Sequence, residues 1–168
     1  MQIGYNKNMI VFRYLEEREL IGILHKETSN IGSHFPKTNS NTFKYKDNEK
    51  YLHFYKKAED MIHIRKIHCK NDVKSRKPGS FYYCAFNIPV VQLIKFAGKG
   101  YYENSGYDTF YTTASEFAIP SQRFNPDWLI GYIKDDHTKP FDTSAFESQI
   151  KSGFRDSIGN ESHKAKIS

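Results

Sequence analysis

The sequence predicts a single α+β domain. Short runs rich in aromatic and β-branched residues recur along the chain, and segments with apolar residues at helical spacing lie between them. The 168 residues include 13 Phe and 12 Tyr, which supply large apolar surfaces for a core. A chain of this length buries roughly 70% of its unfolded surface without disulfides or metals. We expect the domain to span residues 1–135, with a C-terminal helix or flexible tail over 136–168.

A strand and a short helix are expected first. Residues 9–14 (MIVFRY) are apolar and β-rich, and therefore predict a strand. Apolar side chains such as Leu20 and Ile23 recur at helical spacing over 16–24, which predicts an amphipathic helix. The segment 28–48 is rich in Ser, Asn, Thr and Gly and predicts a long loop.

The later elements are mostly strands. The expected strands are 51–55 (YLHFY), 81–88 (FYYCAFNI), 110–113, 115–119 and 128–133 (WLIGYI). A helix is expected over 57–67, a basic turn region over 70–80, and either a strand or a short helix over 90–96. In the C-terminal segment Phe146, Ile150, Phe154 and Ile158 are four positions apart, which predicts one face of a helix.

The chain is basic, with a formal charge of +6 and a pI of about 9.1. Eleven Lys and Arg residues lie between Lys44 and Lys77, among five acids. Such a field attracts polyanions, nucleotide phosphates or acidic protein surfaces. The alternative is a lysine-rich surface that is simply solvated.

Cysteine use and hydropathy predict a cytoplasmic protein that does not enter a membrane. Cys69 and Cys84 are expected to be free thiols, since no secretory signal precedes them. No apolar run approaches the roughly 18 residues of a membrane span. His63, His68 and the two cysteines lack the paired spacing of zinc ligands, and no metal site is expected. Nucleotide-binding glycine loops, HExxH and GxSxG are also missing.

Three separated residues or segments carry possible chemistry. Arg13 ends the first strand, the aromatic strand 51–55 leads into a helix, and Glu116 lies on a later apolar strand. Because strand residues alternate between faces, Glu116 shares a face with Ala118. The plain alternatives are that Arg13 is a surface cation and that Glu116 faces solvent. His53 has no partner acid or nucleophile that would make a catalytic triad.

The order of an arginine strand, a helix, an aromatic strand with a helix and a late glutamate strand resembles the ADP-ribosyltransferase fold. SEFAIPSQRFNPDWLIGYI is similar in layout to the closing section of DarT-type DNA ADP-ribosylating toxins. YLHFYKKAEDMI likewise resembles the strand and helix that wall the NAD pocket in that family. The resemblance covers roughly residues 10–133.

The resemblance implies two small, mostly antiparallel sheets that form a cleft, with short flanking helices. It also implies transfer of ADP-ribose from the substrate NAD to a nucleic-acid or protein acceptor, as in a toxin or phage-encoded effector. The positive charge favours nucleic acid. Glu116 would be the catalytic glutamate, which binds the nicotinamide ribose and stabilises an oxocarbenium-like transition state. Arg13 would position NAD through a phosphate or ribose.

The remaining NAD contacts implied by the resemblance come from aromatic and polar side chains near these two residues. Tyr51 or Tyr55 would stack on the nicotinamide ring, and Thr42 would support the glutamate. Tyr14 and His53 would line the pocket. Ala114 stands where arginine-modifying members carry a second acid, so the acceptor stays open. Two other readings also stay open. One is a non-catalytic basic protein that grips nucleic acid or inhibits a host protein, and the other is a nucleotide-sensing fold without turnover.

Overall fold

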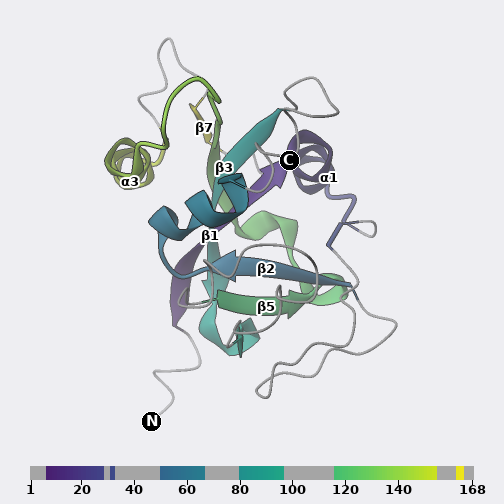
Figure 1. Cartoon of the computed structure of the whole chain (residues 1–168). Coiled ribbons are helices and arrows are strands. Elements are labelled where there is room, and N and C mark those ends of the chain that lie inside the picture. The colour runs from purple at the N-terminus through teal and green to yellow at the C-terminus, as the bar shows by residue number, and fades with distance from the viewer. Residues whose placement is uncertain are drawn as a thin grey trace.

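A computed structural model describes residues 7–28, 31–32, 50–66, 80–96, 116–154 and 162–164. Its strands pair antiparallel in one seven-stranded sheet of order β4-β5-β2-β1-β3-β6-β7 (Figure 1). The strands are β1 (Asn8–Glu16), β2 (Tyr51–Tyr55), β3 (Phe81–Pro89), β4 (Ile94–Phe96), β5 (Glu116–Pro120), β6 (Leu129–Lys134) and β7 (Ser162–Lys164). The helices are α1 (Glu17–Leu24) and α3 (Thr143–Ser152), with short 3-10 turns η2 (Ala58–Asp60), η3 (Val90–Gln92), η6 (Ser121–Arg123) and η7 (Pro126–Trp128).

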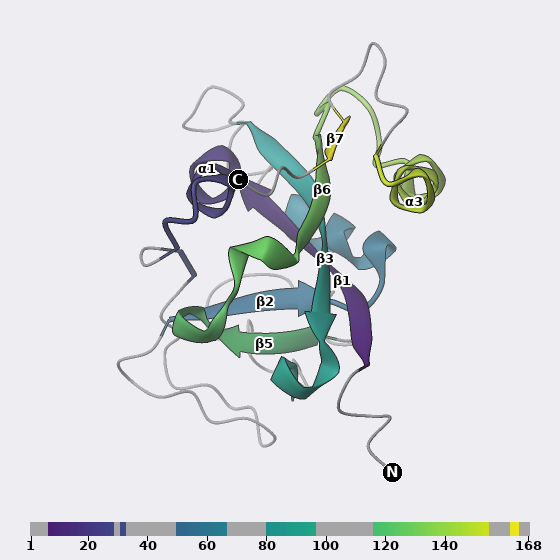
Figure 2. The same ribbon diagram turned by 180° about the vertical axis from the view of Figure 1, so that it is seen from behind.

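The sheet consists of two arms that meet at one residue pair. β1 pairs with β3 along its whole length, from Asn8 opposite Pro89 to Glu16 opposite Phe81. In contrast, β1 and β2 share the single pair Phe12 and Tyr55. Figures 1 and 2 show β2 and β5 running across the direction of β1 and β3. The α+β class is confirmed, and the two expected sheets are two arms of one sheet, because one pair of strands still joins them.

Alternation along the strands divides the core between two clusters. Val11 and Leu15 of β1 belong to a cluster that also holds Leu20 and Ile23 of α1. The intervening Phe12 belongs to a second cluster, which α3 and residues 61–66 help to form. α1 and α3 accordingly lie on opposite sides of the molecule in Figures 1 and 2.

The predicted C-terminal helix forms, but it is shorter than its apolar spacing suggests. The side chain of Asp142 accepts from the Ala145 N–H and caps the start of α3. Gly153 ends the helix in the left-handed region at φ 67°, and Phe154 follows at φ 60°. Phe154 is buried beyond the helix, against Gly131, where a Cβ would overlap its ring. The four-residue spacing therefore predicted the helical face correctly for Phe146 and wrongly for Phe154.

Most other predicted elements appear with small changes of boundary. The strand 51–55 is β2 as predicted, and the helix expected over 57–67 begins with the 3-10 turn η2 before helical residues 61–66. Residues 90–96 divide into η3 and the short strand β4. The strand expected over 110–113 and most of the loop over 28–48 lie outside the described residues. Within the described ranges, no helix is long and apolar enough to cross a membrane.

Candidate functional site

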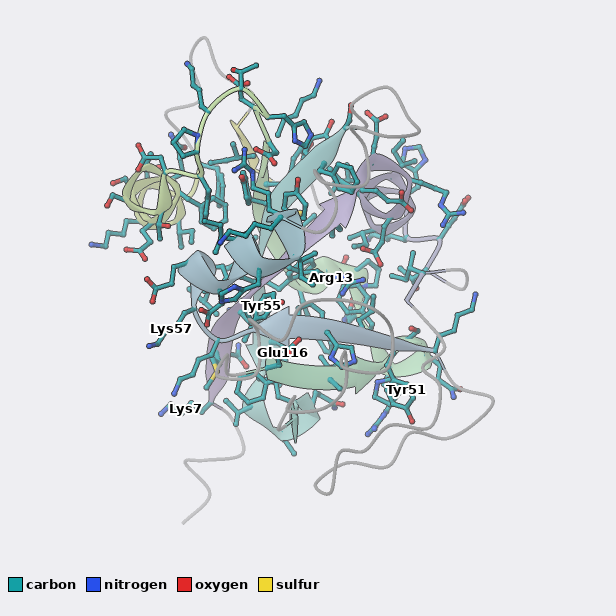
Figure 3. All side chains as sticks on the ribbon, in the orientation of Figure 1. Lys7, Arg13, Tyr51, Tyr55, Lys57 and Glu116 are labelled. Atoms are coloured by element: carbon teal, nitrogen blue, oxygen red, sulfur yellow. The ribbon has the colours of Figure 1, made fainter. Side chains whose placement is uncertain are left out.

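The sheet order brings the three predicted segments together at the junction of its arms. β2 lies between β1 and β5, so the arginine strand, the aromatic strand and the glutamate strand are consecutive neighbours. Phe12 pairs with Tyr55, and Tyr55 pairs with Glu116, which forms one row across three strands. Figure 3 labels Arg13, Tyr55 and Glu116 on the three strands that meet at this junction. Residues about one hundred positions apart in the sequence thus meet in one place.

Glu116 is a buried carboxyl group at the start of β5. It is 2% exposed, and among the described residues its Oε2 has no hydrogen-bond partner. Burial raises the pKa of Glu116 to about 8, with a further contribution from the negative charge of Asp60, while the positive charge of Arg13 acts in the opposite direction. The side chain is therefore mostly protonated at neutral pH. The alternative of a solvent-facing carboxylate is wrong, because the side chain is buried.

His53 of β2 lies beside Glu116. Its Nδ1 lies 3.8 Å from Glu116 Oε1, which is too long for a hydrogen bond. Burial, aided by the charge of Arg13, lowers the pKa of His53 to about 3. The imidazole is therefore neutral, and the pair is a contact between two uncharged side chains around pH 7.

Arg13 joins β1, α1 and β2. Its Nε and NH2 donate to the two carboxylate oxygens of Glu19 at 3.0 and 2.8 Å, and its NH1 donates to the carbonyl of His53 at 2.9 Å. The side chain is 17% exposed and paired, so the alternative of a surface cation is wrong. Because β1 and β2 share one backbone pair, the bond to His53 extends their contact beyond Phe12 and Tyr55. Arg13 therefore stabilises the junction of the two arms.

Arg13 and Glu19 also line a hollow of about 500 Å³ between β1 and α1. Its wall includes Glu16 and Glu27 and the apolar side chain of Ile31. Glu116 does not line it. The arginine and the glutamate are thus electrostatically coupled, as the effect of Arg13 on the pKa of Glu116 shows, without facing the same hollow.

The structure separates the predicted NAD contacts. Tyr55 lies directly opposite Glu116, whereas Tyr51 is paired with Pro120 at the other end of β2, about 13 Å along the strand. Tyr14 is 4% exposed and donates its hydroxyl to Asp135, away from Glu116. Thr42 lies outside the described residues. Of the two tyrosines proposed to stack on nicotinamide, only Tyr55 is next to the glutamate.

Asp60 acts on Glu116 electrostatically, and it pairs with the titratable side chain of His63, whose pKa is lowered by burial. His63 Nε2 lies 3.7 Å from Asp60 Oδ1, and both side chains are half-buried. Burial raises the pKa of Asp60, and the charge of Asp60 raises the pKa of Glu116. No pattern in the sequence singles out Asp60, since the turn η2 that carries it lies within a segment that reads as an ordinary amphipathic helix.

The described residues hold no group of three or more His, Cys, Asp or Glu side chains suited to a metal ion. Cys84 is fully buried in β3, and burial raises the pKa of its thiol well above the ordinary value. This thiol is therefore a packing group. His68 and Cys69 lie outside the described residues.

No model of a known protein family matches the chain, and no curated protein or solved structure matches it either.

Proposed function

We propose that the protein transfers ADP-ribose from NAD to a macromolecular acceptor, with Glu116 as the catalytic carboxylate. The observation that supports this is the adjacency of β1, β2 and β5, which places a buried, incompletely hydrogen-bonded glutamate beside His53 and Tyr55 and within the electrostatic influence of Arg13. Burying an acid without compensating bonds costs stability, and such groups concentrate at functional sites. The order of these three strands along the chain is the feature on which the resemblance to ADP-ribosyltransferases rests.

The proposed reaction breaks the bond between C1′ of the ribose and the nicotinamide nitrogen. The bonding electron pair leaves with nicotinamide and neutralises its ring, while positive charge develops on the ribose. Glu116, once ionised, stabilises that charge from a site of low dielectric constant. A lone pair of the acceptor then bonds to C1′, and the proton of the acceptor passes to the Glu116 carboxylate, whose pKa of about 8 suits it to receive one.

The protonation state of Glu116 is coupled to substrate binding in this scheme. The nicotinamide ring of NAD carries a positive charge, which favours the ionised carboxylate just as Arg13 does. We therefore expect NAD binding to release a proton near neutral pH. Arg13 contributes positive charge and holds β2 in place. Two of its nitrogens donate to Glu19, so they can contact a phosphate directly only if Glu19 releases them.

The test is incubation of the protein with NAD labelled in the nicotinamide ring, scoring nicotinamide release. Glu116→Gln preserves the shape of the side chain and should reduce release by roughly 10²- to 10³-fold, as expected when an electrostatic stabiliser of the transition state is removed. Glu17→Gln, at an exposed position of α1, is the matched control and should retain activity. Equal release by Glu116→Gln and the wild type would refute the assignment.

The alternative of a non-catalytic basic binding protein makes the opposite prediction. Such a protein releases no nicotinamide with any acceptor, and its binding to nucleic acid weakens steeply as the salt concentration rises. Measuring both quantities on one preparation separates the two functions.

A further inference from the structure

A groove of about 550 Å³ lies between the first half of β1, the turn η2 and α3. Its apolar floor includes Ile10 and Phe12 of β1 and Ile150 of α3. Ile10 is 40% exposed, and it is one of three large hydrophobic side chains exposed in the described part of the chain. An apolar side chain of a partner would therefore gain contact with Ile10 on entering this groove.

Charged side chains of both signs line the rim of this groove. Lys56, Lys57 and Lys151 are exposed, and so are Glu59 and Glu147. Figure 3 shows Lys57 projecting outward from the end of β2 where Tyr55 and Glu116 lie. A phosphate backbone carries negative charge at every step and would meet both glutamates. A protein segment can instead place carboxylates against the lysines and leave the two glutamates in contact with water.

The groove lies close to the candidate catalytic residue. Phe12 in its floor is in the same row as Tyr55 and Glu116, so the Cα atoms of Phe12 and Glu116 are two strand spacings apart, or about 10 Å. Directly opposed residues of antiparallel strands project from the same face, and Phe12 and Tyr55 indeed share one core cluster. Glu116 does not line the groove, and a chain bound there contacts Phe12, which is two strands away from Glu116 in the same row.

We propose that this groove binds the acceptor and that the acceptor is a protein segment, with an apolar side chain on the floor and flanking carboxylates on Lys57 and Lys151. This inference rests on the proposed function for the identity of the reaction. The binding itself requires no NAD and can be measured separately. Net charge alone favoured nucleic acid as the acceptor. The acids on the rim of this groove favour protein instead.

The probe is a fluorescein-labelled peptide, Ser-Glu-Leu-Glu-Ser, measured by fluorescence anisotropy without NAD. A second peptide with Ser in place of Leu tests the apolar floor, and a labelled oligothymidylate of twelve nucleotides tests nucleic acid. The variant Lys57→Glu/Lys151→Glu reverses two charges on the rim. Lys139→Glu reverses one charge at an exposed position outside the groove and is the control for charge reversal away from the groove.

We expect the leucine peptide to bind the wild type, with at least tenfold weaker binding to the double variant and unchanged binding to Lys139→Glu. Replacing leucine by serine should also weaken binding at least tenfold. Tighter binding of the oligothymidylate than of the leucine peptide, or equal loss in the double variant and in Lys139→Glu, overturns the proposal. Peptide binding without nicotinamide release from wild-type protein would count against the proposed function alone, and nicotinamide release without peptide binding counts against the groove alone.

Discussion

Two buried acids, Asp135 and Glu116, lie in very different surroundings. Asp135 is 5% exposed and accepts hydrogen bonds from the Tyr14 hydroxyl at 2.6 Å, the Tyr83 hydroxyl at 2.9 Å and Arg65 Nε at 2.8 Å. Glu116 is 2% exposed, and one of its oxygens lacks any hydrogen-bond partner among the described residues. The two side chains are equally buried, but within the described part of the chain only Asp135 has hydrogen bonds that offset the cost of burying its charge.

The comparison distinguishes an acid that holds elements together from one that the fold leaves available. Asp135 links β1, β3 and the helical residues 61–66 through groups that satisfy a negative charge. Arg13 is the arginine whose charge acts on the pKa of Glu116, and its side chain already binds Glu19. Burial consequently raises the pKa of Glu116. A carboxyl group in that condition is poorly suited to stabilising the fold and well suited to receiving charge from a substrate.

The largest expected effect is on stability, at Asp135. Asp135→Ala leaves two buried tyrosine hydroxyls and the Arg65 guanidinium without this partner, and should reduce the free energy of unfolding by about 3–5 kcal/mol. Urea denaturation followed by circular dichroism measures the loss. Asp136→Ala, at the exposed neighbouring position, should cost far less. Similar losses in the free energy of unfolding at the two positions would contradict the stabilising role of Asp135.

A smaller loss of stability is expected at the junction of the arms. Arg13→Lys keeps the positive charge but cannot reproduce the two-pronged pairing with Glu19 together with the bond to the His53 carbonyl. We expect a loss of about 1–3 kcal/mol and faster amide hydrogen exchange in β2. Arg18→Lys is the control, since Arg18 is 88% exposed. Unchanged exchange in β2 would show that Arg13 does not hold the junction.

The titration of Glu116 is expected to make the free energy of unfolding depend on pH. The folded-state pKa of about 8 exceeds the unfolded value of 4.5, so the folded state holds more protons between these values and stability falls as pH rises through this window. His53, with a folded-state pKa of about 3, acts in the opposite sense, and its contribution is complete above pH 6.5. Between pH 6.5 and 8 the wild type should therefore lose about 1–2 kcal/mol.

Glu116→Gln should remove that loss, because glutamine does not titrate. Urea midpoints measured at several pH values from 6.5 to 8 provide the comparison. A wild-type curve as flat as that of Glu116→Gln would mean that Glu116 is ionised in the folded protein at neutral pH.

The smallest effect is expected at Asp60, whose negative charge raises the pKa of Glu116. Asp60→Asn should lower that pKa, so the pH at which nicotinamide release reaches half of its maximal kcat/KM should move downward. Release that depends on ionised Glu116 rises with pH toward about 8 in the wild type. Titration of the Glu116 carboxyl by carbon NMR checks the shift without relying on activity. An unchanged pKa in Asp60→Asn would show that Asp60 does not influence Glu116 electrostatically, and an upward shift would contradict the expected sign.

Local spacing was sufficient to predict most described elements. The aromatic, β-favouring composition of YLHFY predicted β2 at its observed bounds, and the apolar spacing before Gly153 predicted α3 through Phe146. Local pattern also identified Arg13, the aromatic strand and Glu116 as candidates. The resemblance to ADP-ribosyltransferases placed Tyr14 at the same site, whereas the structure shows Tyr14 bonded to Asp135, which is 121 positions away.

The sequence by itself determined which segments are strands and helices and which face of each is apolar, because those properties depend on neighbours a few positions apart. Only the tertiary structure decided that Phe12, Tyr55 and Glu116 form one row, that Glu19 holds Arg13, and that Asp135 is compensated while Glu116 is not. Strand pairing and burial set these relations through contacts between distant segments, and the cost of burying a charge depends on the partners that those contacts supply.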